Sequence, residues 1–115
     1  MDCIFCKIID KVIPSQIVYE DKDVLAFNDI NPAAPVHILV IPKKHIGTVQ
    51  DISSEDKDIL TAMFSAINEI SRIKNLSEQG YRLIINNGKA AGQEVFHLHI
   101  HILGGKDKLG PMLTR

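Results

Sequence analysis

Residues 97–103 read His97-Leu98-His99-Ile100-His101-Ile102-Leu103, so histidine and aliphatic residues alternate strictly through the stretch. Successive side chains of a β-strand point to opposite faces of its sheet, which predicts one face of histidines and one face of aliphatic residues. The aliphatic face belongs to a hydrophobic core. The histidine face lines a site, because burying three imidazoles carries a desolvation cost. Two chemistries suit such a face: a metal cage, or imidazole catalysis at a phosphorus or acyl centre.

The composition describes a small protein without a dominant charge. Its 115 residues predict a single domain, residues 1–115, with a modest core. Hydrophobic residues make up 45% and the formal net charge is −1, so no basic excess predicts a nucleic-acid partner. No apolar run approaches the roughly 20 residues of a membrane helix, and the charged N-terminus is unlike a signal peptide. We therefore expect a cytoplasmic protein with no membrane partner.

Hydrophobic patterning predicts an α+β fold. Two helices are expected, a short one over residues 3–9 and a long one over 53–73 that Ser53 caps. Strands are expected at 16–20, 24–28, 37–41, 81–86 and 95–103. We expect these five strands to form an antiparallel meander packed against the long helix.

The loop before the histidine strand favours catalysis at a phosphorus centre. A neutral imidazole is a good nucleophile near neutral pH when an acceptor holds its other nitrogen as N–H, and a covalent histidine intermediate divides a hard hydrolysis into two easier steps. Gly88 and Gly92 let the backbone approach a ligand closely. The amides of Gln93 and Glu94 could then donate to phosphate oxygens.

The two cysteines, Cys3 and Cys6, have the spacing of a metal-ligand pair. A structural zinc ion would need two more ligands, which must come from the five histidines at 37, 45, 97, 99 and 101. A Cys₂His₂ site with His45 and one end of the histidine strand would fasten the N-terminus to the sheet. The alternatives are a pair of free thiols, or a catalytic metal held by the three histidines of the strand. No acidic residue on the histidine face could act as the base in the latter.

Residues 97–103 resemble the defining motif of the histidine triad (HIT) family. Residues 4–9, 25–30, 39–45 and 92–96 also resemble family segments in the family's order, and Gly104-Gly105 resembles the Hint-like branch of purine nucleoside phosphoramidases. The resemblance implies a HIT-like five-stranded antiparallel sheet with one long helix and a short N-terminal helix. It also implies a homodimer in which two such sheets join into one of ten strands.

The same resemblance implies an enzyme that cleaves the P–N bond of purine nucleoside 5′-phosphoramidates, such as AMP joined to an amine or to lysine. His99 would be the nucleophile that becomes nucleotidylated, His101 would bind phosphate and assist proton transfer, and His37 would be a further catalytic histidine. Asp29 would accept hydrogen bonds from the ribose hydroxyls, although it could equally serve only to stabilise its turn. The implied base contacts are Ile30, Phe5 and Ile13, and the implied phosphate contacts are Asn86, Gly92, Gln93 and Glu94.

Zinc-containing bacterial members of the family begin with a similar Cys-x-x-Cys pair. Their remaining ligands match His45 and His97, so the resemblance implies a structural zinc held by Cys3, Cys6, His45 and His97, with no cofactor needed for the chemistry. Many relatives carry serine where this chain has Glu94. An ionised glutamate accepts hydrogen bonds and does not donate them, so we expect its backbone N–H to contact phosphate and its side chain to favour a cationic leaving group.

Two other classes of function remain open on the sequence. One is a metal-dependent hydrolase that uses the histidine strand as ligands. The other is a nucleotide-binding interaction module without turnover.

Overall fold

The structure is a computed structural model that describes residues 3–113. Its main elements agree with the expected α+β class, and none of its helices is both long and apolar enough to cross a membrane. Short 3-10 turns lie at Val49–Asp51, Ser54–Asp56 and Lys89–Ala91. The helices and strands are α1 (Ile4–Ile9), β1 (Ile17–Glu20), β2 (Val24–Asn28), β3 (Val36–Pro42), α2 (Lys57–Ile73), β4 (Arg82–Ile84) and β5 (Ile100–Gly104).

The five strands form one antiparallel sheet in the order β1-β2-β3-β5-β4. The expected meander is therefore wrong, because β5 pairs with β3 and leaves β4 at the edge. The long connection that contains α2 joins β3 to β4, and a connection of this length does not oblige the two strands to be neighbours, as a tight hairpin would. The histidine-bearing strand consequently lies inside the sheet, between β3 and β4.

Ser53 is a cap as expected, but it caps the 3-10 turn Ser54–Asp56 instead of the first turn of α2. Its hydroxyl accepts a hydrogen bond from the N–H of Glu55, and the Asp56 carboxylate accepts one from the N–H of Ser53 at 2.9 Å. This reciprocal pair satisfies N–H groups that have no partner inside a helix. The capped 3-10 turn leads directly into α2, which begins at Lys57 and ends at Ile73.

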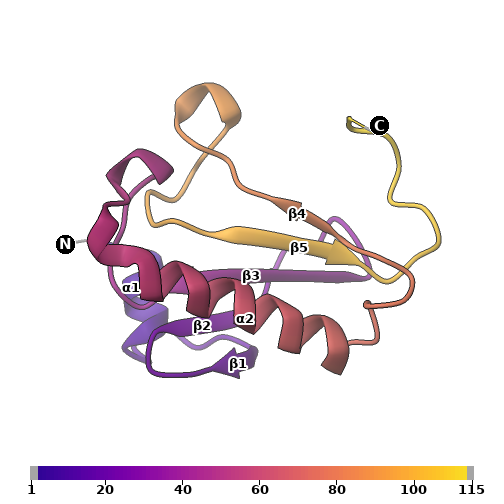
Figure 1. Cartoon of the computed structure of the whole chain (residues 1–115), viewed down its shortest axis with the longest axis horizontal. Coiled ribbons are helices and arrows are strands. Elements are labelled where there is room, and N and C mark those ends of the chain that lie inside the picture. Colours follow the sequence, from indigo (N-terminus) through magenta and orange to yellow (C-terminus); the bar gives the residue numbers. More distant parts are fainter. Residues whose placement is uncertain (1–2, 114–115) are drawn as a thin grey trace.

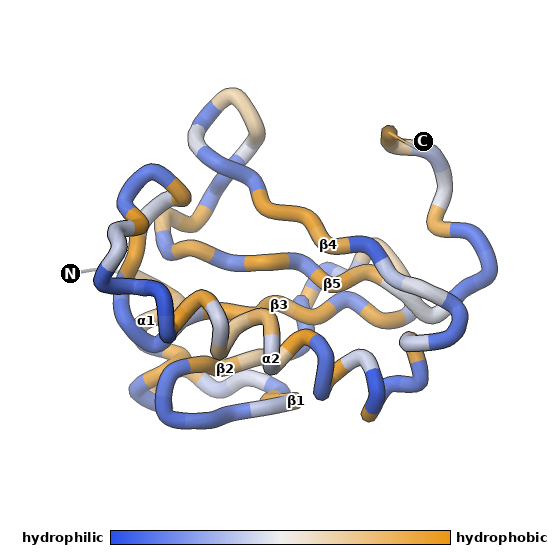
Figure 2. Tube along the Cα trace, viewed as in Figure 1, coloured by the Kyte–Doolittle hydropathy of each residue, from blue (hydrophilic) through white to orange (hydrophobic). Residues whose placement is uncertain are grey.

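The two faces of the sheet are covered by different helices. In Figure 1, α2 lies in front of the sheet and the fainter α1 lies behind it. The side chains of Val40, Ile67 and Ile102 belong to the core under α2, whereas Phe5 and Phe27 belong to a second core under α1. Strands β2 and β3 contribute to both cores, and Figure 2 shows them as mostly hydrophobic, in contrast to the hydrophilic turn between β1 and β2.

The predicted strand at 95–103 is shorter in the structure, where β5 begins at Ile100. His97 and His99 lie in the segment that leads into it, where the N–H of Leu98 donates to the carbonyl of Ile46 at 2.6 Å instead of joining the sheet. Likewise β4 spans Arg82–Ile84 instead of residues 81–86. The predicted alternation is nevertheless confirmed, because the aliphatic residues 98, 100 and 102 are all buried in the core under α2.

Candidate active site and metal cluster

A cavity of about 510 Å³ opens on the sheet face that α1 partly covers. Strand register builds its floor: Phe27 of β2 lies opposite Leu39 of β3, which in turn lies opposite His101 of β5. Directly opposed residues share a face, so these three side chains form one row across the sheet. The predicted site residues found on the cavity wall are Phe5, Ile13, Asp29, Ile30, Asn86, Gly92, Glu94, His99 and His101.

His99 is held with one ring nitrogen turned into the protein. Its Nδ1 lies 2.8 Å from the backbone carbonyl of His97, and only a protonated Nδ1 can donate to that oxygen. The lone pair of His99 is therefore on Nε2, which has no hydrogen-bond partner within residues 3–113. The edge of Phe5 packs against the imidazole, with ring centroids 5.3 Å apart, and leaves the His99 side chain on the cavity wall. This is the arrangement that a nucleophilic imidazole requires.

His37 stands behind His101 instead of on the cavity wall. The N–H of Ala33 donates to Nδ1 of His37 at 2.9 Å, so the hydrogen of the neutral ring is on Nε2. That nitrogen lies 2.9 Å from Nδ1 of His101 and 3.4 Å from Oδ2 of Asp29. His37 thus donates to His101, and the remaining hydrogen of His101 is carried on Nε2.

Burial makes His101 a neutral group at physiological pH. Desolvation, followed by the neighbouring His99 and His37, lowers the pKa of His101 to about 4, while Asp29 opposes the shift. A neutral ring with its hydrogen on Nε2 can donate to a phosphate oxygen or to a leaving group.

Asp29, His37 and His101 are also close enough together to suggest a metal site. Coordination through Nε2 of His37 would move its hydrogen to Nδ1, where it would meet the N–H of Ala33 head-on. This hydrogen-bond arrangement favours proton transfer over metal binding in this cluster.

Gln93 and Glu94, in the loop before β5, were both expected to contact phosphate but have different surroundings. Gln93 is buried and does not line the cavity. Its side chain accepts from the N–H of Gly88 and donates to the carbonyls of Gly47 and Val95, so it braces the loop. Its own N–H donates to the carbonyl of Gly88. The exposed Glu94 does line the cavity, and its N–H has no partner within residues 3–113.

The outer end of the cavity is apolar and open. Ile30 is 91% exposed, and Ile13 is half-buried nearby on the cavity wall. Asp29 also lines the cavity, and its Oδ1 accepts from the N–H of Asn31 at 2.8 Å, so the expected turn-stabilising bond is present. Its other oxygen faces His37 at 3.4 Å.

Sequence reasoning missed several wall residues, including Phe27 and Leu39. Alternation along a strand indicates which residues share a face, but it does not indicate which strands are neighbours or in which register. Only the pairing of β2, β3 and β5 places these two side chains beside His101. The other wall residues not anticipated are Ile4, Ile8, Pro14, Ser15, Asn28 and Val95.

A second cluster joins the N-terminus to the sheet as expected. Cys3, Cys6, His45 and His97 each offer a ligand atom within 4.8 Å of the others. Nδ1 of His97 lies 3.3 Å from Sγ of Cys3 and 3.6 Å from Sγ of Cys6, and Nδ1 of His45 lies 3.3 Å from Sγ of Cys6. Sulfur and nitrogen ligands of a tetrahedral zinc ion stand about 3.6 Å apart. The residues present therefore fit zinc.

The hydrogen bonds of this cluster suit a metal as well. Nε2 of His97 donates to the carbonyl of Pro42 at 2.7 Å, which leaves the lone pair on Nδ1 facing the thiols. Burial, with the neighbouring Cys3 thiol, raises the pKa of Cys6 to about 11, so the thiolate requires a cation beside it. A zinc ion would supply that charge and cross-link α1 to the segment preceding β5.

The chain belongs to the HIT domain family, whose model matches residues 10–108. The matched range contains the histidine strand and Asp29 but neither cysteine. Among curated proteins, the chain is 50% identical over 113 residues to the purine nucleoside phosphoramidase of Escherichia coli K12, covering 98% of this chain and 94% of that protein. It is also 50% identical over 103 residues to Protein HitA of Neisseria gonorrhoeae, covering 90% and 95%.

Solved structures agree with this assignment. A histidine triad protein from Clostridium difficile superimposes with a TM-score of 0.92 at 54% identity, covering 97% of this chain and 96% of that one. A HIT family hydrolase from Clostridium thermocellum gives a TM-score of 0.92 at 52% identity, covering 98% and 97%.

Proposed function

We propose that this protein hydrolyses the P–N bond of purine nucleoside 5′-phosphoramidates through a covalent nucleotidyl intermediate on His99. The observation that carries the proposal is the hydrogen bond from Nδ1 of His99 to the carbonyl of His97, which leaves the Nε2 lone pair available on a cavity wall. The similarity to a relative named purine nucleoside phosphoramidase supports the substrate class.

In the first step Nε2 of His99 attacks phosphorus, and the P–N bond to the amine breaks with its electron pair on nitrogen. His101 delivers the proton from its Nε2 to that nitrogen, so the amine leaves as a neutral molecule. The hydrogen bond from His37 to Nδ1 of His101 stabilises the negative charge that builds on the His101 ring. The free N–H of Glu94 is available to a phosphate oxygen.

In the second step a water molecule attacks the same phosphorus. Its oxygen forms the new P–O bond, the bond from phosphorus to Nε2 of His99 breaks, and one water proton returns to Nε2 of His101. The products are the nucleoside monophosphate and the free amine, and both histidines regain their starting forms. Asp29 would hold the ribose hydroxyls, and Ile30, Ile13 and Phe5 would contact the base.

We also propose that Cys3, Cys6, His45 and His97 hold a structural zinc ion. Zinc would balance the two thiolates, and its ligation by His97 excludes that ring from the chemistry. A cytoplasmic location suits the two free thiols.

Intact-protein mass spectrometry tests the mechanism. The enzyme is mixed with an adenosine phosphoramidate, quenched within seconds, and weighed beside His99→Ala and a metal-stripped sample. We expect a mass increase of one adenylyl group on the native protein, its absence from His99→Ala, and its retention after stripping.

Two other outcomes would reassign the protein. Turnover without an adduct, lost on removal of the metal, would identify a metal-dependent hydrolase. Binding of AMP with neither adduct nor turnover would favour a nucleotide-binding module.

A homodimer is the proposed assembly. Strand β4 is an edge of the sheet, and Leu83 of β4 and Ile85 beside it are 38% and 44% exposed. Phe64 on α2 is 49% exposed. Pairing of two β4 edges would cover apolar surface and join two sheets into one of ten strands.

A further inference from the structure

The charge on the cavity wall is unusual for a site that handles phosphate. As far as residues 3–113 define it, the wall carries two carboxylates, those of Asp29 and Glu94, and no lysine or arginine. Sites that bind polyphosphates use arginine and lysine to neutralise the substrate. This cavity instead presents imidazoles and carboxylates, an arrangement that disfavours ligands of high negative charge.

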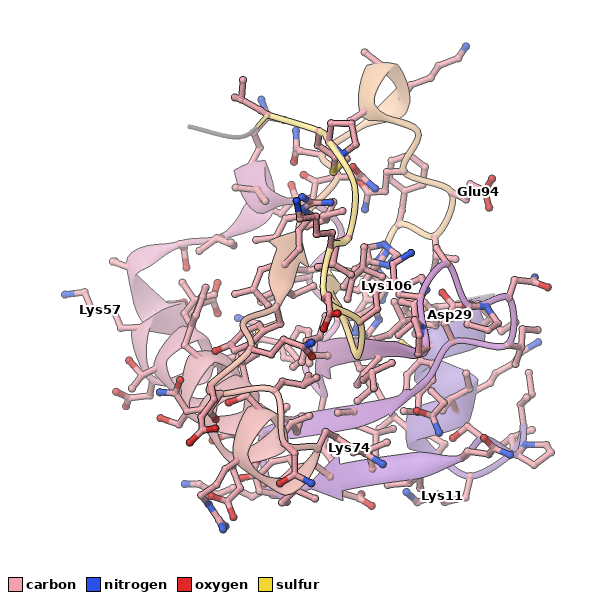
Figure 3. All side chains as sticks on the ribbon, turned by 90° about the vertical axis from the view of Figure 1, so that its right-hand side faces the viewer. Lys11, Asp29, Lys57, Lys74, Glu94 and Lys106 are labelled. Atoms are coloured by element: carbon pink, nitrogen blue, oxygen red, sulfur yellow. The ribbon has the colours of Figure 1, made fainter. Side chains whose placement is uncertain are left out.

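The two carboxylates differ in how they are engaged. Asp29 accepts a hydrogen bond from the N–H of Asn31 and faces His37. Glu94 is exposed, and its carboxylate has no hydrogen-bond or ion-pair partner within residues 3–113. Figure 3 shows Glu94 projecting outward from the chain on the same side of the molecule as Asp29. Its charge is therefore available to a ligand.

The strand register places the catalytic histidines between these two carboxylates. Asn28 lies opposite Ile38, which lies opposite Ile102, so Asp29 is level with the C-terminal end of β5. Glu94 precedes the N-terminal end of the same strand. In the proposed function Asp29 is occupied by the nucleoside and His99 by the phosphorus, so Glu94 is the wall carboxylate that remains for the leaving group.

We infer that Glu94 selects substrates by the charge of the leaving group, favouring amines that carry a second, cationic group and disfavouring anionic ones. This inference rests on the proposed function. A cationic substituent would offset the negative phosphoryl group and pair with Glu94, the carboxylate of the described cavity wall that lacks a partner. An anionic leaving group would meet Glu94 with no positive side chain of the wall to offset it. Attraction or repulsion between exposed unit charges a few ångströms apart changes a rate by about fivefold.

Three adenosine 5′-phosphoramidates of similar length test the inference. Their leaving amines are butane-1,4-diamine, which is cationic at its far end, pentylamine, which is neutral there, and 4-aminobutanoate, which is anionic there. The measured quantity is kcat/KM at low ionic strength for the native enzyme, Glu94→Gln and Glu94→Lys. Glu78→Gln is the matched control, because it removes the same charge from an exposed position outside the cavity wall.

We expect the native enzyme to prefer the cationic leaving group over the neutral one and the neutral one over the anionic one. The ratio of cationic to anionic kcat/KM should fall by about 25-fold in Glu94→Gln, because an attraction and a repulsion of about fivefold each are lost, and should drop below one in Glu94→Lys. It should stay unchanged in Glu78→Gln. Added salt should shrink the native ratio.

Two failures can be told apart. In the first, the native enzyme hydrolyses the neutral substrate, but the ratio of cationic to anionic kcat/KM in Glu94→Gln stays within twofold of the native ratio. That result would overturn the role of Glu94 alone. Hydrolysis of none of the three substrates by the native enzyme would overturn the proposed function and this inference with it.

Discussion

At the scale of single residues, hydrogen bonds to the backbone give the histidines different tautomers and therefore different roles. Two different backbone carbonyls accept hydrogen bonds from Nδ1 of His99 and from Nε2 of His97, so those nitrogens carry the ring hydrogen. In His37 a backbone N–H donates to Nδ1, so the ring hydrogen is on Nε2. The free lone pairs therefore face the cavity in His99 and the thiols in His97. The imidazoles are chemically equivalent in the sequence, and their different tautomers follow from these contacts.

The low pKa of His101 predicts a loss of stability in mild acid. In the unfolded chain this histidine takes up a proton near its ordinary pKa of 6.5, whereas in the folded protein it does so only near 4. Between these values the unfolded state binds more protons, so the free energy of unfolding decreases as the pH falls through this window. Three groups face the ring of His101: His99 and His37 lower its pKa, and Asp29 raises it.

Urea unfolding of the native protein and His101→Asn, at equal metal content and across that pH range, measures the effect. The free energy of unfolding should change less steeply with pH in the variant, and the difference in slope should correspond to at most about one bound proton. Equal slopes for the two proteins would show that His101 is not responsible. Burial also lowers the pKa of His97, and that contribution is common to both proteins.

At the scale of elements, α1 is positioned by its first residues. Cys3 is the N-cap of this helix, and its sulfur accepts from the N–H of Cys6 at 3.3 Å. Phe5 then packs on Phe27 of β2 in an edge-to-face contact, with ring centroids 5.5 Å apart. This short helix and its N-cap thus supply two members of the Cys/His cluster and also pack against the ring of His99.

Removal of the proposed zinc ion should loosen this helix from the sheet. We expect chelation to lower the melting temperature of the native protein by about 10 °C, because a tightly bound ion stabilises only the folded state. Cys6→Ser should melt at a similarly reduced temperature and should not respond to the chelator. Both samples should still form the adenylyl adduct below their melting temperatures. Loss of turnover on chelation without a change in melting temperature would contradict a structural role.

The elements were predictable to different degrees. The long helix over Lys57–Ile73 follows from its apolar stripe, and alternation at 97–103 predicted the histidine face. The order of the strands did not follow from local patterns, because the connection through α2 permits several arrangements. Residues 97–99 continue the alternation of β5 without belonging to the strand, because β4 has ended at Ile84 and the N–H of Leu98 donates to Ile46 instead.

At the scale of the whole molecule, each edge strand of the sheet exposes an aliphatic side chain, and β4 has a second one beside it. β4 displays Leu83 and is flanked by Ile85, and we expect it to pair with a second copy. Leu83→Asp should shift the protein from dimer to monomer, because the charge would be buried beside a strand of the partner. Light scattering coupled to size-exclusion chromatography measures the mass directly.

The other edge provides the control for this experiment. Ile17 of β1 is 44% exposed, so Ile17→Asp makes the same kind of change at the opposite side of the sheet. It should leave the dimer intact. Dissociation by Ile17→Asp and not by Leu83→Asp would place the interface on β1, and a native protein that is already monomeric would exclude the dimer.

The sequence by itself determined the α+β class, the long helix and the histidine face. These features depend on periodicity and on residue type, which are local properties. The tertiary structure decided the position of β5 between β3 and β4, the wall formed by Phe27 and Leu39, and the bracing role of Gln93. It also decided the tautomer of each histidine, because strand register and hydrogen-bond partners join residues that lie far apart in the chain.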